Sequence, residues 1–160
     1  MIVVCDSTVL IGLSKIGKLE LLREVFGEVD VPGEVFREVT DEGLNRPGAK
    51  AVKQADWIKV REIKDRSQVS FLLGTLDKGE AEVLALAKES NADLILLDEE
   101  KARKIAVIAG FDIMGLLGLF VLAKNIGLLD RIGPLIEELR RKSFRISDRV
   151  VSAALKRAGE

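Results

Sequence analysis

Residues 1–17 read MIVVCDSTVLIGLSKIG, and this stretch decides the fold. An apolar run at residues 2–5 ends at Asp6, and apolar residues then recur at helical spacing over residues 10–16. A short apolar run bounded by polar residues is typical of a fully buried strand. We therefore expect a central strand with Asp6 at its carboxyl end, the edge at which open α/β sheets bind ligands. Alternatively, Asp6 or Ser7 serves only to cap the helix that follows.

The composition predicts one folded domain with a substantial core. The chain has 160 residues, of which 48% are hydrophobic, enough to bury a core and too apolar for disorder. Its longest apolar runs fall far short of the roughly 20 residues that a membrane span needs, and no signal-peptide pattern is present. We expect a cytoplasmic protein with no membrane association. The single cysteine, Cys5, excludes an internal disulfide and is expected to pack as a small hydrophobic residue.

The chain contains no histidine. This excludes Ser-His-Asp and Cys-His catalysis, histidine-based zinc sites and histidine as a general base. Any metal site must then use oxygen ligands, which favours Mg²⁺ or Mn²⁺.

The net charge of −1 hides an asymmetry along the chain. Residues 1–100 hold 13 basic and 20 acidic side chains, a net charge of −7, whereas residues 101–160 hold 12 and 6, a net charge of +6. Such a division suggests an acidic site beside a basic surface. The alternative is that the basic run at residues 137–145 is a solvated helix face.

Strand and helix patterns alternate along the rest of the chain. We expect further strands at residues 28–31, 57–63, 92–98 and 111–115. We expect further helices at residues 18–26, 32–43, 47–55, 79–90, 99–110, 116–127, 131–142 and 147–159, with a turn at 45–46 and glycines at 27, 43 and 110 near helix ends. Residues 64–79 are the least regular and predict a loop around one helical turn. This alternation predicts an α/β fold: a doubly wound parallel sheet with helices on both faces, and extra helices at the C-terminal end.

Acidic residues from four separated segments are candidates for one site. Asp98 follows an apolar strand as Asp6 does, so both are expected at the same edge of the sheet. Glu80 lies at a helix start, where the helix dipole favours a carboxylate, and Glu82 would face another way. Glu38 borders the buried face of its helix, which is costly without compensation. Taken singly, each acid is expected to be a helix cap or a surface charge. If the acids meet in the fold, their mutual repulsion raises their pKa values, and a bound divalent cation relieves that repulsion.

Five motifs in order resemble the PIN-domain family, in particular its prokaryotic VapC-like branch. They are VCDSTVLIGL at 4–13, VPGEVFREV at 31–39, LDKGEAEVLALA at 76–87, LILLDEEKAR at 94–103 and GFDIMGLLGLFVLAKNIGLL at 110–129. The resemblance implies a single PIN-like domain over residues 1–160, with its motif core at 1–130 and a C-terminal helical extension at 131–160. It also implies a Mg²⁺- or Mn²⁺-dependent endoribonuclease that cleaves single-stranded RNA.

Position by position, the resemblance implies four acids that bind the metal and carry the catalysis: Asp6, Glu38, Glu80 and Asp98. Glu99 or Glu100 could contribute in place of Asp98, and Glu100 is a further candidate metal ligand. Thr8 stands where the family has a small polar residue that orients the first acid. The chain departs from the family pattern at Glu80, where many relatives have aspartate, and at Leu116, where threonine is common.

Basic residues in the second part of the chain are the expected RNA contacts, through sequence-independent binding of phosphates. They are Arg103, Lys104, Arg140, Arg141 and Arg145. With aromatic residues at 4% of the chain, base stacking is expected to contribute little. By family analogy the protein is the toxin of a toxin–antitoxin pair, with a small antitoxin partner and a homodimeric state, and residues 116–127 serve as core or as an interface.

Two other function classes compete with the nuclease. The first is a catalytically weak or inactive PIN-fold module that binds nucleic acid or a partner without cutting. The second is a receiver-like phosphoacceptor, which is also doubly wound with acids at strand ends. A phosphoacceptor needs an acid pair after the first strand, and residues 5–8, CDST, lack that pair.

Overall fold

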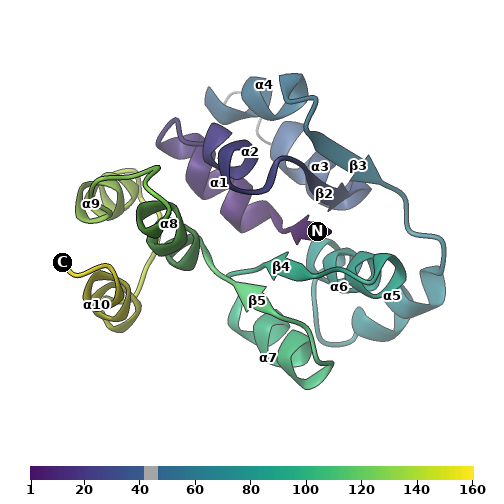
Figure 1. The fold of residues 1–160 in the computed structure, drawn as a ribbon. Coiled ribbons are helices and arrows are strands. Elements are labelled where there is room, and N and C mark those ends of the chain that lie inside the picture. The colour runs from purple at the N-terminus through teal and green to yellow at the C-terminus, as the bar shows by residue number, and fades with distance from the viewer. Residues whose placement is uncertain (42–46) are drawn as a thin grey trace.

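The computed structural model describes residues 1–41 and 47–160. It contains one parallel sheet in the order β3-β2-β1-β4-β5 (Figure 1). The strands are β1 (Val3–Cys5), β2 (Val29–Pro32), β3 (Ile58–Arg61), β4 (Leu94–Leu96) and β5 (Ile113–Met114). All five expected strands are therefore present, and the α/β prediction with a parallel sheet is confirmed.

The order of the strands shows that the sheet is doubly wound. The chain proceeds outward from β1 through β2 to β3, then returns to the other side of β1 and continues through β4 to β5. Because crossovers between parallel strands are right-handed, this reversal places the connecting helices on both faces of the sheet. The reversal point lies between β1 and β4, where Cys5 is in register with Leu96. Ligands of open α/β sheets bind at such a point, beyond the carboxyl ends of the strands.

The helices follow the predicted alternation. They are α1 (Ser7–Lys15), α2 (Glu20–Phe26), α3 (Gly33–Thr40), α4 (Pro47–Gln54), α5 (Arg66–Leu72), α6 (Lys78–Ser90), α7 (Glu100–Ile108), α8 (Leu116–Asn125), α9 (Gly133–Arg141) and α10 (Asp148–Arg157). Gly27 and Gly110, at φ of 81° and 90°, follow α2 and α7 as expected, because glycine adopts positive φ at low cost. The predicted turn at 45–46 and the predicted helix end at Gly43 lie outside the described residues.

The prediction for residues 64–79 needs correction, because this segment contains the seven-residue helix α5. The carboxylate of Asp65 accepts a hydrogen bond from the N–H of Ser67 at 3.0 Å and so caps the helix. Val69 is buried, whereas Phe71 is 84% exposed. An apolar pattern that includes an exposed phenylalanine does not show helical periodicity, which explains why the sequence alone suggested a loop.

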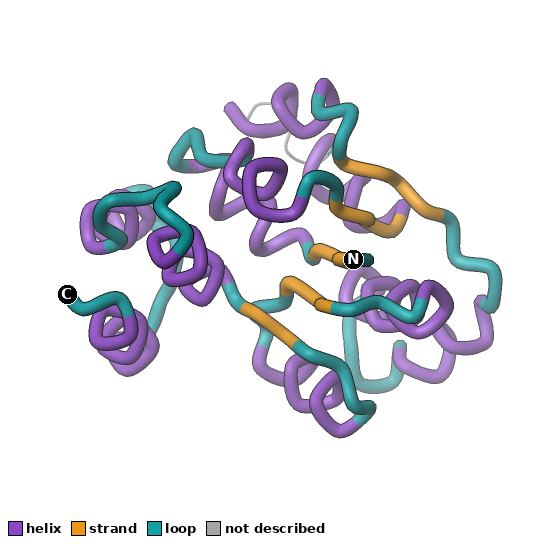
Figure 2. Tube along the Cα trace, in the orientation of Figure 1, coloured by secondary structure: helices purple, strands orange, loops and turns teal. Residues whose placement is uncertain are grey.

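The C-terminal helices α8, α9 and α10 lie together at one side of the molecule (Figures 1 and 2). Helix α10 packs against α8, and α8 contacts α1. Leu119 and Phe120 of α8 are fully buried, so α8 serves the core. Cys5 is fully buried as well, in agreement with its expected packing role. None of the helices in the described part of the chain is long and apolar enough to cross a membrane.

A buried carboxylate on α6 holds together the two helices that carry Glu38 and Glu80. Helix α3 follows Pro32, which has no side chain able to cap it, and the N–H of Glu34 instead donates to Oε1 of Glu82 at 3.2 Å. Oε2 of Glu82 accepts an ion pair from Arg66 of α5 at 3.1 Å. Glu82 is 3% exposed and lies at the positive end of the α3 dipole, so it connects α3, α5 and α6.

Replacement of Glu82 by alanine is expected to lower the free energy of unfolding by about 2–3 kcal/mol, because an N–H group and a guanidinium both lose a charged partner. Urea denaturation followed by circular dichroism measures this. The matched control Glu137→Ala, on the exposed surface of α9, is expected to stay within about 0.5 kcal/mol of the wild type. Equal stability of the two variants would show that this carboxylate does not connect the helices.

Candidate functional site

Asp6 lies at the point where the sheet reverses direction. It directly follows β1, is 4% exposed, and caps α1, with Oδ1 accepting from the N–H of Val9 at 2.9 Å. Oδ2 accepts from the N–H of Asp98, beyond β4, at 3.1 Å. One carboxylate therefore connects the carboxyl ends of two neighbouring strands.

Asp98 is held against the start of α8. Its Oδ1 and Oδ2 accept from the N–H of Leu116 at 3.2 and 3.1 Å. Gly115, which precedes Leu116, has no room for a side chain, because a Cβ there would overlap Oδ1 of Asp98. The requirement is steric, since Gly115 has a φ of −91° that any residue adopts.

Burial raises the pKa values of both carboxyls, and repulsion by neighbouring acids raises the pKa of Asp6 further. Burial is the main cause that raises the pKa of Asp6 to about 7, with further contributions from the charges of Asp98 and Glu80, while the N–H groups of Val9 and Asp98 lower it. Burial also raises the pKa of Asp98, against the lowering effects of the Leu116 N–H and of Arg103. The site therefore opposes the accumulation of negative charge.

Glu80 and Glu38 come from two adjoining helices. Glu80 and Asp77 form a capping box at the start of α6, in which Oε2 of Glu80 accepts from the Asp77 N–H at 3.2 Å. Burial is the main cause that raises the pKa of Glu80 to about 6, and the charges of Asp77 and Glu99 add to it. The Glu38 carboxylate lies over Gly79, where an added Cβ would be 3.6 Å from each of its oxygens. This is an ordinary van der Waals distance, so the Glu38 carboxylate lies directly beside the first turn of α6.

Three further predicted residues occupy different positions. Glu99 caps α7 by accepting from the N–H of Ala102 at 2.8 Å. Glu100 is 80% exposed and pairs with Lys104 at 3.0 Å, so the structure does not bring it to the other acids. Thr8 lines a cavity of about 320 Å³ together with Asp98 and Glu99. Backbone N–H groups, as described above, orient Asp6, and an orienting role for Thr8 stays a prediction.

The five predicted basic residues divide into two groups. Arg103 and Arg145 lie at the acids: Nη1 of Arg103 donates to the carbonyl of Leu97 at 2.6 Å, and Arg145 lines the same cavity as Thr8. Arg140 forms an ion pair with Asp148 at 2.8 Å, Lys104 pairs with Glu100, and Arg141 is exposed at the end of α9. Sequence reasoning missed Gly115 and the N–H of Leu116, for which the only signal was a glycine at a strand-to-helix junction.

The site suits a hydrated hard cation better than a metal enclosed by protein ligands. In residues 1–41 and 47–160, no three His, Cys, Asp or Glu side chains are grouped closely enough to hold an ion between them. Mg²⁺ commonly keeps several waters and is bound by one or two carboxylates together with phosphate oxygens of a substrate. The adjacent carboxylates of Asp6 and Asp98, with oxygen donors only, fit that mode of binding, and the steric space kept by Gly115 leaves Asp98 in place for it.

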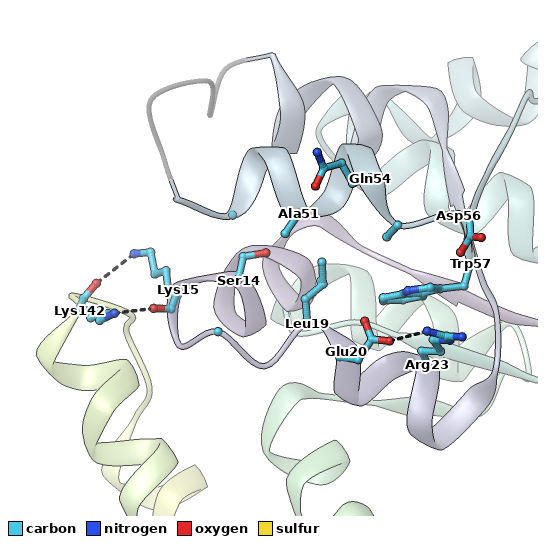
Figure 3. Close-up of a pocket in the computed structure, with 13 residues that line it drawn as sticks. Ser14, Lys15, Leu19, Glu20, Arg23, Ala51, Gln54, Asp56, Trp57 and Lys142 are labelled. Atoms are coloured by element: carbon cyan, nitrogen blue, oxygen red, sulfur yellow. Dashed lines mark hydrogen bonds and ion pairs between the residues drawn. The ribbon is translucent and has the colours of Figure 1, made fainter.

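A larger cavity of about 640 Å³ lies away from the acids (Figure 3). It is formed at the C-terminal end of α1, and its lining includes Ser14, Trp57 and Lys142. Lys15 and Lys142 each donate from Nζ to the carbonyl of the other, at 3.1 and 2.8 Å. Because α1 starts at Asp6 and runs away from the carboxyl edge, this cavity is separate from the acidic site.

Comparison with known proteins identifies the family of the chain. A family model described as a PIN domain matches residues 2–160, which includes α9 and α10 as well as the motif core. No curated protein matches the chain.

The raised pKa of Asp6 predicts a pH dependence of stability. Between about pH 4 and pH 7 the folded protein keeps a proton on Asp6 that the unfolded chain releases, so the free energy of unfolding falls as pH rises through this window. The full difference in pKa corresponds to about 4 kcal/mol. Urea denaturation of metal-free protein across this window measures the slope, which Asp6→Asn should flatten and the exposed control Asp56→Asn should not. Parallel profiles for wild type and Asp6→Asn would contradict the assignment.

The steric requirement at Gly115 predicts that Gly115→Ala destabilises the protein by about 1–3 kcal/mol, because the new methyl group must displace the Asp98 carboxylate or the start of α8. Thermal unfolding followed by circular dichroism measures this. Gly74→Ala is the matched control, since a Cβ at Gly74 meets nothing within 4 Å and its φ is not positive. An effect of equal size at both positions would show that Asp98 does not depend on this space.

Proposed function

The chain belongs to the PIN-domain family, whose members are generally nucleases, and from that premise we propose that it is a divalent-metal-dependent ribonuclease that cleaves single-stranded RNA. One observation carries the proposal: the N–H of Asp98 donates to Asp6 at the reversal point of the sheet, so that a buried acid and a half-buried acid come together at one edge of the sheet. Such a pair is costly without a cation. The proximity of Glu80 and the approach of Glu38 to α6 extend the acidic surface.

The described contacts support a role for each acid. Asp6 and Asp98 would hold Mg²⁺ or Mn²⁺, and Glu38 and Glu80 would contact its water ligands. When bound, the ion would lower the pKa of a water and neutralise charge that develops on the phosphate. The N–H groups of Val9 and Leu116 keep the two aspartates oriented.

A proton acceptor is also needed, because the chain has no histidine. Glu80 is the candidate, since a carboxyl whose pKa is raised to about 6 is closer to the value suited to a general base near neutral pH. Its Oε2 accepts a hydrogen bond from the Asp77 N–H. To act as the base, it would give up this hydrogen bond and accept a proton from the attacking water.

A second candidate function is RNA binding without cleavage. It is favoured by the engagement of Glu80 in its capping box and by the lack, within the described ranges, of three acids around one point. The substitution of glutamate for the aspartate common in relatives is in keeping with such a loss of activity.

For the biological setting, we propose the toxin of a toxin–antitoxin pair, acting in the cytoplasm as a homodimer and inhibited by a small antitoxin that covers the acidic site. The resemblance of the motifs to the VapC-like branch supports this setting.

Cleavage of a labelled single-stranded RNA separates the two candidate functions. The nuclease proposal predicts cleavage with Mg²⁺ or Mn²⁺, its abolition by EDTA, and a rate at least about 100-fold lower in Asp6→Asn and Asp98→Asn. Glu137→Gln, which removes an exposed carboxylate of α9, is expected to keep the wild-type rate. If RNA binds but the wild type leaves it intact with either metal, the binding module is correct.

A further inference from the structure

A cavity of about 390 Å³ lies beside Asp98, between the end of β5 and helices α8 and α10. Its lining includes the carboxylate-bearing Asp98 and three arginines: Arg103 of α7, and Arg149 and Arg157 of α10. Figure 1 shows α10 next to α8, where the C-terminal helices gather. The cavity therefore combines a proposed metal ligand with guanidinium groups from two distant parts of the chain.

The charges of this cavity favour an anion. Three arginines and one carboxylate line it, and within the described part of the chain Arg103 alone of the three donates to a protein acceptor, the carbonyl of Leu97. Among residues 1–41 and 47–160, neither Arg149 nor Arg157 forms an ion pair, although the charge of Arg149 acts on the nearby Glu100. Two planar guanidinium groups are thus available for a bidentate acceptor such as phosphate.

The sequence of α10 leaves space between these two arginines. Arg149, Ala153 and Arg157 are spaced by four residues and share one helical stripe, and all three line the cavity. The methyl group of Ala153 keeps the region between the arginines open. Basic residues are common in the last turn of a helix, where the dipole favours a cation, and this explains Arg157. It does not explain Arg149, which lies in the first turn, where the dipole disfavours a cation.

We infer that this cavity binds a phosphate group of a nucleic-acid strand whose neighbouring phosphate lies at Asp6 and Asp98. This inference rests on the proposed function, because RNA is the source of the phosphate. Asp98 borders both places, so a strand that leaves the acids on the α10 side meets Arg149 and Arg157. Helix α10 would then determine on which side of the acids the strand is held.

Binding of a fluorescein-labelled oligouridylate in EDTA, followed by anisotropy, tests the inference without cleavage. Arg149→Gln/Arg157→Gln is expected to weaken affinity at least about tenfold. It should also reduce the slope of log K against log salt by about 0.7, since the cavity binds one phosphate and each phosphate neutralised on a single strand contributes about 0.7. The matched control Lys50→Gln/Lys53→Gln removes the same charge from exposed positions on α4, and it should change neither value. Thermal unfolding establishes that both double variants are folded.

The outcomes distinguish this inference from the proposed function. Arginine-dependent binding without metal-dependent cleavage supports the phosphate subsite and overturns the nuclease. Cleavage by the wild type, with unchanged affinity and salt slope in the arginine variant, supports the nuclease and overturns the subsite. Absence of RNA binding by the wild type, or equal losses in the arginine and lysine variants, also overturns the subsite.

The chemical source of the phosphate is resolved by comparing two RNAs that differ only at the 5′ end. If the arginine variant loses affinity for 5′-phosphorylated RNA alone, the cavity binds a terminal phosphate. If it loses affinity equally for 5′-phosphorylated and 5′-hydroxyl RNA, the cavity binds an internal phosphate. Each result supports the subsite and specifies the part of the strand it recognises.

Discussion

The hydrogen bond from the N–H of Asp98 to Oδ2 of Asp6 is the contact on which the site depends. It is possible only because β1 and β4 are neighbours in the sheet, at the point where the winding reverses. The same contact brings a second carboxylate toward a buried one, and the protein offsets part of that cost with backbone N–H groups. A site built in this way is more stable when an acid is protonated or a cation is bound.

Much of this arrangement could be predicted from the sequence, because its determinants are local. An apolar run that stops at an aspartate predicts both a buried strand and the position of that aspartate at the sheet edge, as at Asp6 and Asp98. Gly27 and Gly110 end their helices through their own conformational freedom. The parallel sheet then follows from the alternation of elements, and the meeting of the two strand ends follows from the sheet.

The features of the site that the sequence did not predict depend on contacts between distant segments. The exposure of Glu100 follows from the direction in which α7 leaves β4, and residues 98–100 alone do not determine that direction. The steric role of Gly115 is visible only with Asp98 beside it. The exposed phenylalanine of α5 obscures the helical pattern of that segment in the sequence. Arg149 and Arg157 line one cavity with Asp98 only because α10 packs against α8. In each case the determining neighbour lies on another element.

Two buried carboxylates of this chain show how a structural acid differs from one available to a ligand. Glu82 and Asp6 are 3% and 4% exposed, and each accepts a backbone N–H. Glu82 also has the guanidinium of Arg66, so its charge is balanced within the protein. The groups that act on Asp6 are N–H donors and the like charges of Asp98 and Glu80. Burial alone therefore does not identify a functional acid; a buried acid whose neighbours are other acids is the one that an external cation stabilises.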